Sequence, residues 1–189
     1  MIITEQKKLS QILEYLKDAG SVFIVGCGRC ATSCETGGEK EVKVMADKLK
    51  KAGKKVTGTA VIEAPCDDRL VIKELRAQST EMKKAEALLV MSCGVGTQTV
   101  AELSQMPTYP ALESLFLGRT KRIGKFYEMC LMCGECILDE TGGICPVARC
   151  SKHLLNGPCG GSHNGKCEVD QKYDCAWYLI YERLKSQGK

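Results

Sequence analysis

The sequence lacks the patterns that identify membrane, secreted and nucleic-acid-binding proteins. No apolar run approaches the roughly 20 residues that a membrane-spanning helix needs. The segment Met1–Lys8 has no charged-then-apolar secretory pattern. Aromatic residues make up only 5% of the chain and the net charge is +4, and the interleaved aromatic and basic patches of single-strand binders are absent. We therefore expect a cytoplasmic protein with no membrane and no nucleic acid among its partners.

Cysteine, by contrast, is abundant, with 13 in 189 residues. Disulfides are rare in the reducing cytoplasm, and an odd number of cysteines cannot all pair within one chain. The sequence shows no Ser/His/Asp arrangement and no paired carboxylates at a recognisable spacing, so it does not indicate a catalytic set. Metal binding is the remaining common reason for so many cysteines.

Strand-like and helical patterns alternate through the first half of the chain. The strand-like runs cover residues 22–25, 55–62 and 87–91. The helical patterns cover residues 1–20, the region of 42–49, and 67–84 with a break near Ser79, and a short helix is expected after Thr97. This alternation predicts a parallel sheet with helices on both faces, a Rossmann-like three-layer α/β domain.

The composition changes after this region. Pro107 and Pro110 interrupt the pattern, and a basic stretch, residues 119–125, follows. Eight of the 13 cysteines then fall between residues 130 and 175, which leaves little room for an apolar core. We therefore expect an α/β domain over residues 1–118 and a small cysteine-rich metal-cluster domain over residues 119–189, with two metal sites and an amphipathic helix over 175–184.

Five cysteines are expected at one edge of the predicted sheet. The three strands lead into Cys27, Cys66 and Cys93, and the loop after the first strand adds Cys30 and Cys34. The carboxyl ends of parallel strands share one edge, where ligands bind. A [4Fe–4S] cluster needs four thiolates, and we favour Cys27, Cys30, Cys34 and Cys93, with Cys66 as the alternate. The alternative is that these residues are small buried hydrophobic groups.

The glycines near Cys93 allow two interpretations. Gly94-Val-Gly96 resembles part of a dinucleotide-binding loop, but it lacks the third glycine and the later acidic residue. We therefore expect a tight turn before a helix capped by Thr97.

The second cysteine group begins with Cys130-x2-Cys133-x2-Cys136, which repeats the first three positions of the bacterial ferredoxin motif. The remaining members are Cys145, which precedes Pro146, and Cys150, Cys159, Cys167 and Cys175. Eight cysteines suffice for two four-thiolate sites, but the spacing does not assign each residue to one of them. Zinc is the alternative to a cluster in the second site, and His153 or His163 could then replace one thiolate.

Several segments of the cysteine-rich half resemble the C-terminal family associated with methylenetetrahydrofolate reductase. The resemblance is carried by Cys130–Cys136, Thr141–Pro146, Leu154–Gly161, Gly165–Val169 and Asp174–Trp177. With the Gly26–Cys34 segment included, nearly the whole chain resembles the MetV-type small subunits of acetogenic bacteria.

This resemblance implies an iron–sulfur electron-transfer subunit of the Wood–Ljungdahl pathway without a catalytic site of its own. It would carry two or three [4Fe–4S] clusters, with Zn2+ in place of one as the alternative. Electrons would pass from ferredoxin or a larger electron-transfer complex to the FMN of a flavin-binding barrel subunit. That partner reduces 5,10-methylene-tetrahydrofolate to 5-methyl-tetrahydrofolate. The other hypotheses are a zinc-stabilised structural adapter and a self-sufficient nucleotide-dependent oxidoreductase.

Overall fold

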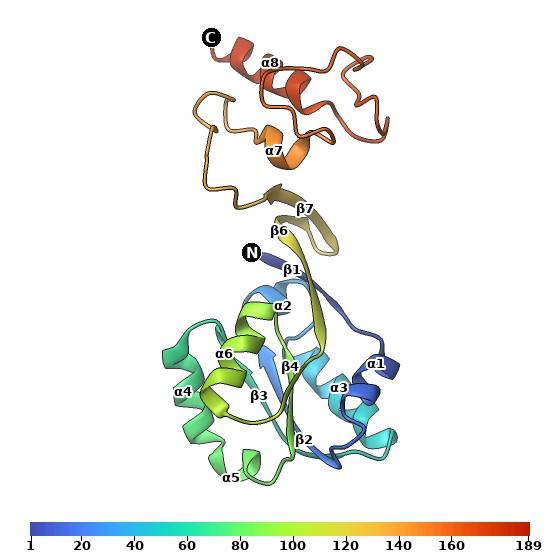
Figure 1. Ribbon diagram of the computed structural model, residues 1–189, viewed down its shortest axis with the longest axis vertical. Helices are drawn as coiled ribbons and strands as arrows, with labels where there is room; N and C mark the ends of the chain where they lie inside the picture. Colours follow the sequence, from blue (N-terminus) through green and yellow to red (C-terminus); the bar gives the residue numbers. More distant parts are fainter. The chain divides into compact units, whose positions relative to one another are not determined.

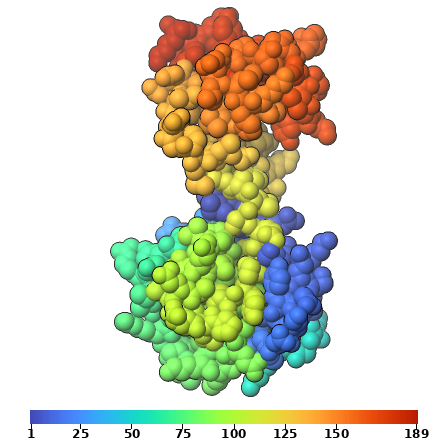
Figure 2. Space-filling model, viewed as in Figure 1, coloured from blue at the N-terminus to red at the C-terminus, as the bar shows by residue number.

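The computed structural model describes residues 1–189 and divides into two compact units. Unit 1 comprises Met1–Phe116 and Thr120–Phe126, and unit 2 comprises Leu117–Arg119 and Tyr127–Lys189. The first half of the chain is coloured blue to green in the space-filling view, and most of unit 2 is orange to red (Figure 2).

Unit 1 is built on a four-stranded parallel sheet. Its strands are β2 (Ser21–Cys27), β3 (Lys55–Ile62), β4 (Ala87–Met91) and β5 (Thr108–Pro110). The strand order is β3-β2-β4-β5, and every neighbouring pair is parallel. The three expected strands and their parallel pairing are thus confirmed. The short β5 was not predicted, because its three residues end in a proline and carry almost no periodic signal.

Helices cover both faces of this sheet, as expected (Figure 1). The helices on one face are α1 (Leu9–Tyr15) and α3 (Glu39–Lys51), and those on the other are α4 (Asp68–Ala77), α5 (Ser79–Met82) and α6 (Gly94–Ser104). Successive side chains of the buried strand β2 pack alternately against the helices on one face of the sheet and those on the other. Ile24 joins the core beneath α1 and α3, whereas Phe23 and Val25 join the core beneath α4, α5 and α6. The expected break of the 67–84 helix near Ser79 is also confirmed.

The N-terminus differs from the single helix expected over residues 1–20. The chain forms strand β1 (Ile2–Gln6) before α1, and β1 pairs with the long strand β6 (Leu112–Arg122). Ile3 and Thr4 are buried in that strand. The apolar residues among the first few positions therefore belong to an edge strand. Only the residues from Leu9 onward follow the helical spacing of apolar residues.

The region between the two halves also contains structure that was not predicted. Strand β7 (Lys125–Cys130) pairs with β6 across a turn at Gly124, whose φ is +72°. The order in this second sheet is β1-β6-β7. Glycine allows such a backbone at no steric cost. The basic stretch expected as a junction is thus a hairpin, in which the chain passes from one unit to the other.

Unit 2 has little regular structure and little core. It contains the short helix α7 (Pro146–Arg149) and the expected C-terminal helix, α8 (Ala176–Ser186). Only six residues between Tyr127 and Lys189 are buried. They are Thr141, Ile144, Pro146, Cys175, Ala176 and Ile180. Apolar burial on this scale is small for a segment of this length. None of the helices in either unit has the length and apolar character needed to cross a membrane.

The loop after β2 is held against the sheet by a close backbone approach at Gly37. The Cys27 N–H donates to the Gly37 carbonyl at 2.9 Å, and a Cβ on Gly37 would overlap the carbonyl oxygen of Met91 in β4. The loop contains helix α2 (Cys30–Ser33), which lies at the carboxyl end of the strands (Figure 1). The glycine thus keeps the cysteines of this loop beside the sheet edge.

We predict that Gly37→Ala destabilises unit 1 by roughly 1–3 kcal/mol, because the new methyl group forces the loop away from β4. Thermal or urea unfolding of the reduced protein measures the effect. Gly20→Ala is the matched control, since a Cβ there would make only ordinary contact, 3.5 Å from the Glu86 carboxylate. Equal stability of the two variants would show that the close approach at Gly37 does not hold the loop.

Candidate metal centres

The cysteines of unit 1 gather where the strand order of the parallel sheet reverses. Along the chain, β2 is followed by β3 on one side of it and by β4 on the other. Cys27 is the last residue of β2, and Cys93 is the N-cap residue of α6, two positions after the end of β4. The crevice outside the carboxyl ends of strands at such a point is where open α/β sheets bind ligands.

Three of these cysteines interact with one another. Burial raises the pKa of the Cys27 thiol, and negative charge on the neighbouring Cys30 and Cys93 raises it further. The backbone N–H groups of Ala31 and Arg29 donate to the Cys27 sulfur and act in the opposite direction. Cys27 therefore lies in a buried position that already supplies hydrogen bonds to a thiolate, although burial disfavours the charged form.

The remaining two cysteines of unit 1, Cys34 and Cys66, lie in different surroundings, the first buried and the second exposed. Cys66 follows Pro65, whose ring lies 3.0 Å from the position of a Cβ on Gly96 in the first turn of α6. The thiol of Cys34 instead donates to the Ile2 carbonyl of β1 at 3.8 Å. Neither contact involves the Cys66 sulfur, so the preference for Cys34, with Cys66 as the alternate, stays a prediction. That the five cysteines bind metal stays a prediction.

The start of α6 differs from the expected cap at Thr97. The helix begins at Gly94, with Cys93 as its N-cap residue, and the Gly94 N–H donates to the Ser114 hydroxyl at 2.9 Å. Thr97 lies one turn inside the helix, and its hydroxyl donates to the Cys93 carbonyl at 3.1 Å. The loop is therefore a tight turn into a helix, as expected, but Cys93 holds the cap position.

In unit 2, the Cys130-x2-Cys133-x2-Cys136 segment forms an exposed loop directly after β7. Cys130 is the last residue of β7, and the Met132 N–H donates to its sulfur at 3.3 Å. Met132 and Gly134 both have left-handed backbones, with φ of 54° and 82°. These two residues turn the chain around the sulfurs, and Cys133 in turn donates to the Glu135 carbonyl at 3.5 Å.

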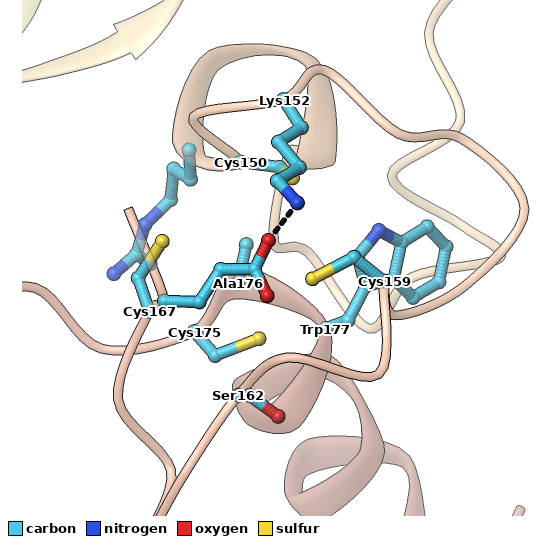
Figure 3. A pocket seen from close by; sticks show the side chains of 10 residues that line it. Cys150, Lys152, Cys159, Ser162, Cys167, Cys175, Ala176 and Trp177 are labelled. Carbon is cyan, nitrogen blue, oxygen red and sulfur yellow. Dashed lines mark ion pairs between the residues drawn. The ribbon is translucent and has the colours of Figure 1, made fainter. Parts of the chain in front are cut away.

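Four later cysteines line one pocket of unit 2 (Figure 3). They are Cys150, Cys159, Cys167 and Cys175. Cys145, the N-cap residue of α7, does not line this pocket, and neither do the three cysteines of the Cys130–Cys136 loop. The structure thus separates the eight late cysteines into one group of four around a pocket and the other four outside it.

Cys167 has the most favourable surroundings for a thiolate in this group. The backbone N–H groups of Asp170 and Val169 lower the pKa of its thiol, and the Ser151 hydroxyl and the charge of Lys152 add to the effect. The Ser151 oxygen lies 3.7 Å from the Cys167 sulfur. Lys152 also forms an ion pair with Glu168, and both side chains line the pocket.

The donor chemistry of these sites fits thiophilic metals, whether iron in a cluster or zinc. Each of the three cysteine groups contains a sulfur that accepts backbone N–H bonds. These sulfurs belong to Cys27, Cys130 and Cys167. Such bonds surround metal-bound thiolates and tune their centres. No three His, Cys, Asp or Glu side chains converge tightly enough to hold an ion in the present arrangement. Binding therefore requires the loops to close around the metal.

Neither histidine lies at the four-cysteine pocket, where the sequence allowed one of them to replace a thiolate. The His153 Nδ1 lies 2.7 Å from the Val147 carbonyl oxygen, and His163 is in a backbone bridge with Lys166. Sequence reasoning instead overlooked Lys152 and Glu168. Their positions next to ligand candidates, two residues after Cys150 and one after Cys167, are the signal that would have identified them.

Comparison with known families relates the second half of the chain to one enzyme. Residues 109–189 match the family described as methylene-tetrahydrofolate reductase C terminal. No curated protein and no solved structure matches the chain at a significant level. The C-terminal part, with all eight late cysteines, is therefore similar to this family, in agreement with that part of the expected resemblance. The match does not extend to residues 1–108.

We predict that the metal-free, reduced protein reacts with iodoacetamide several-fold faster at Cys167 than at Cys27 near pH 7.5. The thiolate is the nucleophile, and the pKa of Cys167 is lowered while burial raises that of Cys27. Peptide mapping by mass spectrometry after short exposures measures both rates. Denatured protein, in which the two rates should converge, is the control. Faster reaction at Cys27 in the folded protein would contradict the environments described above.

Proposed function

We propose that this chain is an iron–sulfur electron-transfer subunit that delivers electrons to the FMN of a methylenetetrahydrofolate reductase partner. The proposal is carried by the Cys130–Cys136 loop, in which the ferredoxin-like spacing coincides with left-handed turns and an N–H bond to sulfur. The family match of residues 109–189 supports the choice of methylenetetrahydrofolate reductase as the enzyme in this proposal. The partner reduces 5,10-methylene-tetrahydrofolate to 5-methyl-tetrahydrofolate, with ferredoxin or a larger electron-transfer complex as the donor.

Two groups of residues are suited to hold the redox centres. In unit 1 these are Cys27, Cys30, Cys34 and Cys93, with Cys66 as the alternate. In unit 2 they are the three cysteines of the Cys130–Cys136 loop, with Cys145 as the remaining late cysteine outside the pocket. An iron–sulfur cluster bound at such a site supplies reversible one-electron transfer.

The polypeptide sets the properties of each site through burial and hydrogen bonds to sulfur. Backbone N–H groups stabilise the more negative, reduced state of a thiolate-bound centre and raise its reduction potential, whereas burial among apolar groups opposes added charge. Cys27 is buried, whereas Cys130 is exposed. The two sites therefore differ in solvent access, so we expect their reduction potentials to differ.

A zinc-stabilised structural adapter without a redox role is the second candidate. The small number of buried residues in unit 2 favours it, since bound metal must then supply stability there. Four cysteines around one pocket also form a closed donor set of the type found in structural zinc sites. Under this hypothesis the anaerobically isolated protein is colourless and contains zinc without iron.

We predict that Cys133→Ala, produced anaerobically together with the barrel partner, loses about four iron atoms per chain, because one [4Fe–4S] centre needs all four thiolates. Ferredoxin-dependent reduction of the partner's FMN should become at least tenfold slower. Iron and sulfide analysis and stopped-flow flavin absorbance measure the two effects.

The matched control for this variant is Leu138→Ala, which changes an exposed side chain two residues beyond Cys136. Both iron content and FMN reduction should remain at wild-type values in that protein. Normal iron content in Cys133→Ala would remove Cys133 from the ligand set. Normal FMN reduction by an iron-depleted variant would contradict the electron-transfer role itself.

A further inference from the structure

The four-cysteine pocket of unit 2 gathers residues that are widely spaced along the chain. Cys150, Cys159, Cys167 and Cys175 are separated by eight, seven and seven residues. None of these intervals has the short Cys-x2-Cys spacing that identifies a metal site in a sequence. The grouping is therefore a product of the fold, and it could not be assigned from spacing.

Contacts that do not involve the thiols hold the surrounding backbone together. The Cys175 N–H donates to the Gly165 carbonyl at 2.8 Å, and the Cys167 N–H donates to the Tyr173 carbonyl at 3.0 Å. The Trp177 indole N–H donates to the Leu154 carbonyl at 2.9 Å, which joins the first turn of α8 to the segment between Cys150 and Cys159. The pocket is thus framed by a hydrogen-bonded backbone before any metal is considered.

The pocket also contains one ion pair, between Lys152 and Glu168 (Figure 3). Gly161 leaves room for the carboxylate, since a Cβ on Gly161 would overlap the Glu168 side chain. A divalent ion bound by four thiolates has a net charge of about −2. Glu168 adds another negative charge, so a cation is needed at this place if the site is to be loaded.

We propose that Cys150, Cys159, Cys167 and Cys175 ligate one thiophilic metal centre, separate from that of the Cys130–Cys136 loop, and that Lys152 offsets its negative charge. The inference deepens the proposed function and rests on it for the metal-binding role of these cysteines. Zn2+ and an iron–sulfur cluster share this ligand chemistry, and metal analysis distinguishes them. Because the four thiols do not yet converge, metal binding closes the segment between Cys150 and α8.

The partition is tested with single and double variants of the full chain purified anaerobically. Cys159→Ser and Cys133→Ser should each lose one centre, and the double variant should lose both, as measured by iron, sulfide and zinc analysis with electron paramagnetic resonance of the reduced protein. Leu155→Ala, which alters an exposed side chain between Cys150 and Cys159 that does not line the pocket, is the control and should retain both. Circular dichroism checks that each variant keeps the fold of unit 1.

If Cys133→Ser and Cys159→Ser lose the same centre, and the double variant loses no more, the partition is wrong. A wild-type protein with zinc only would end the electron-transfer proposal, whereas the partition would still be tested by the zinc lost from each variant. The two proposals therefore fail through different results.

The role of Lys152 is tested by the rate at which a chelator removes metal from the loaded protein. Lys152→Met keeps the length of the side chain but leaves Glu168 unpaired, so loss from the four-cysteine site should become about tenfold faster. Adding Glu168→Gln should restore most of the wild-type rate, because it removes the uncompensated negative charge. Lys172→Met, at an exposed lysine that does not line the pocket, is the control. An unchanged rate in Lys152→Met would exclude Lys152 as the compensating cation.

Discussion

The charge on cysteine sulfur is the constraint on which unit 2 depends. Eight thiols lie in a segment with only six buried residues, so apolar burial contributes little to holding the loops in place. Thiolates brought together repel one another unless a cation lies between them, and a bound metal turns that repulsion into attraction. Backbone N–H groups at Cys130 and Cys167 offset part of the charge beforehand. The loops of unit 2 therefore supply hydrogen bonds to sulfur in place of an apolar core.

Unit 1 meets the same constraint differently, because its cysteines lie at the edge of a packed sheet. Cys27 ends a fully buried strand, and the loop that follows is held by the close approach of Gly37 to β4. The sheet and its two apolar layers are complete without any ligand. Under the proposed function, metal bound at this edge would add to a packed domain, whereas metal bound in unit 2 would contribute to the fold itself.

The difference explains what could be predicted from the sequence. The apolar runs of β3 and β4 predicted the first and last residue of both strands correctly. The ends of the strands also led to the correct expectation that Cys27 and Cys93 share an edge of the sheet. The short β5 and the strand at the N-terminus were missed because such elements depend on pairing with neighbours distant in sequence. The assignment of the late cysteines to the two expected sites stayed open for a related reason. The members of the four-cysteine pocket are joined by loops of seven or eight residues, whose closure depends on backbone contacts such as that between Trp177 and Leu154.

Cys27 and Cys167 lie in opposite electrostatic surroundings, since the pKa of the first thiol is raised and that of the second is lowered. Burial makes the thiolate of Cys27 costly until a cation arrives, so a metal bound there gains from exclusion of water and is protected from exchange. Cys167 is held in a turn that favours the thiolate in advance, with Lys152 nearby, so it is suited to capture a metal from solution. Under the proposed function, a metal bound in unit 1 would therefore lie in a buried environment, whereas loading of the site in unit 2 would be linked to the closure of its loops.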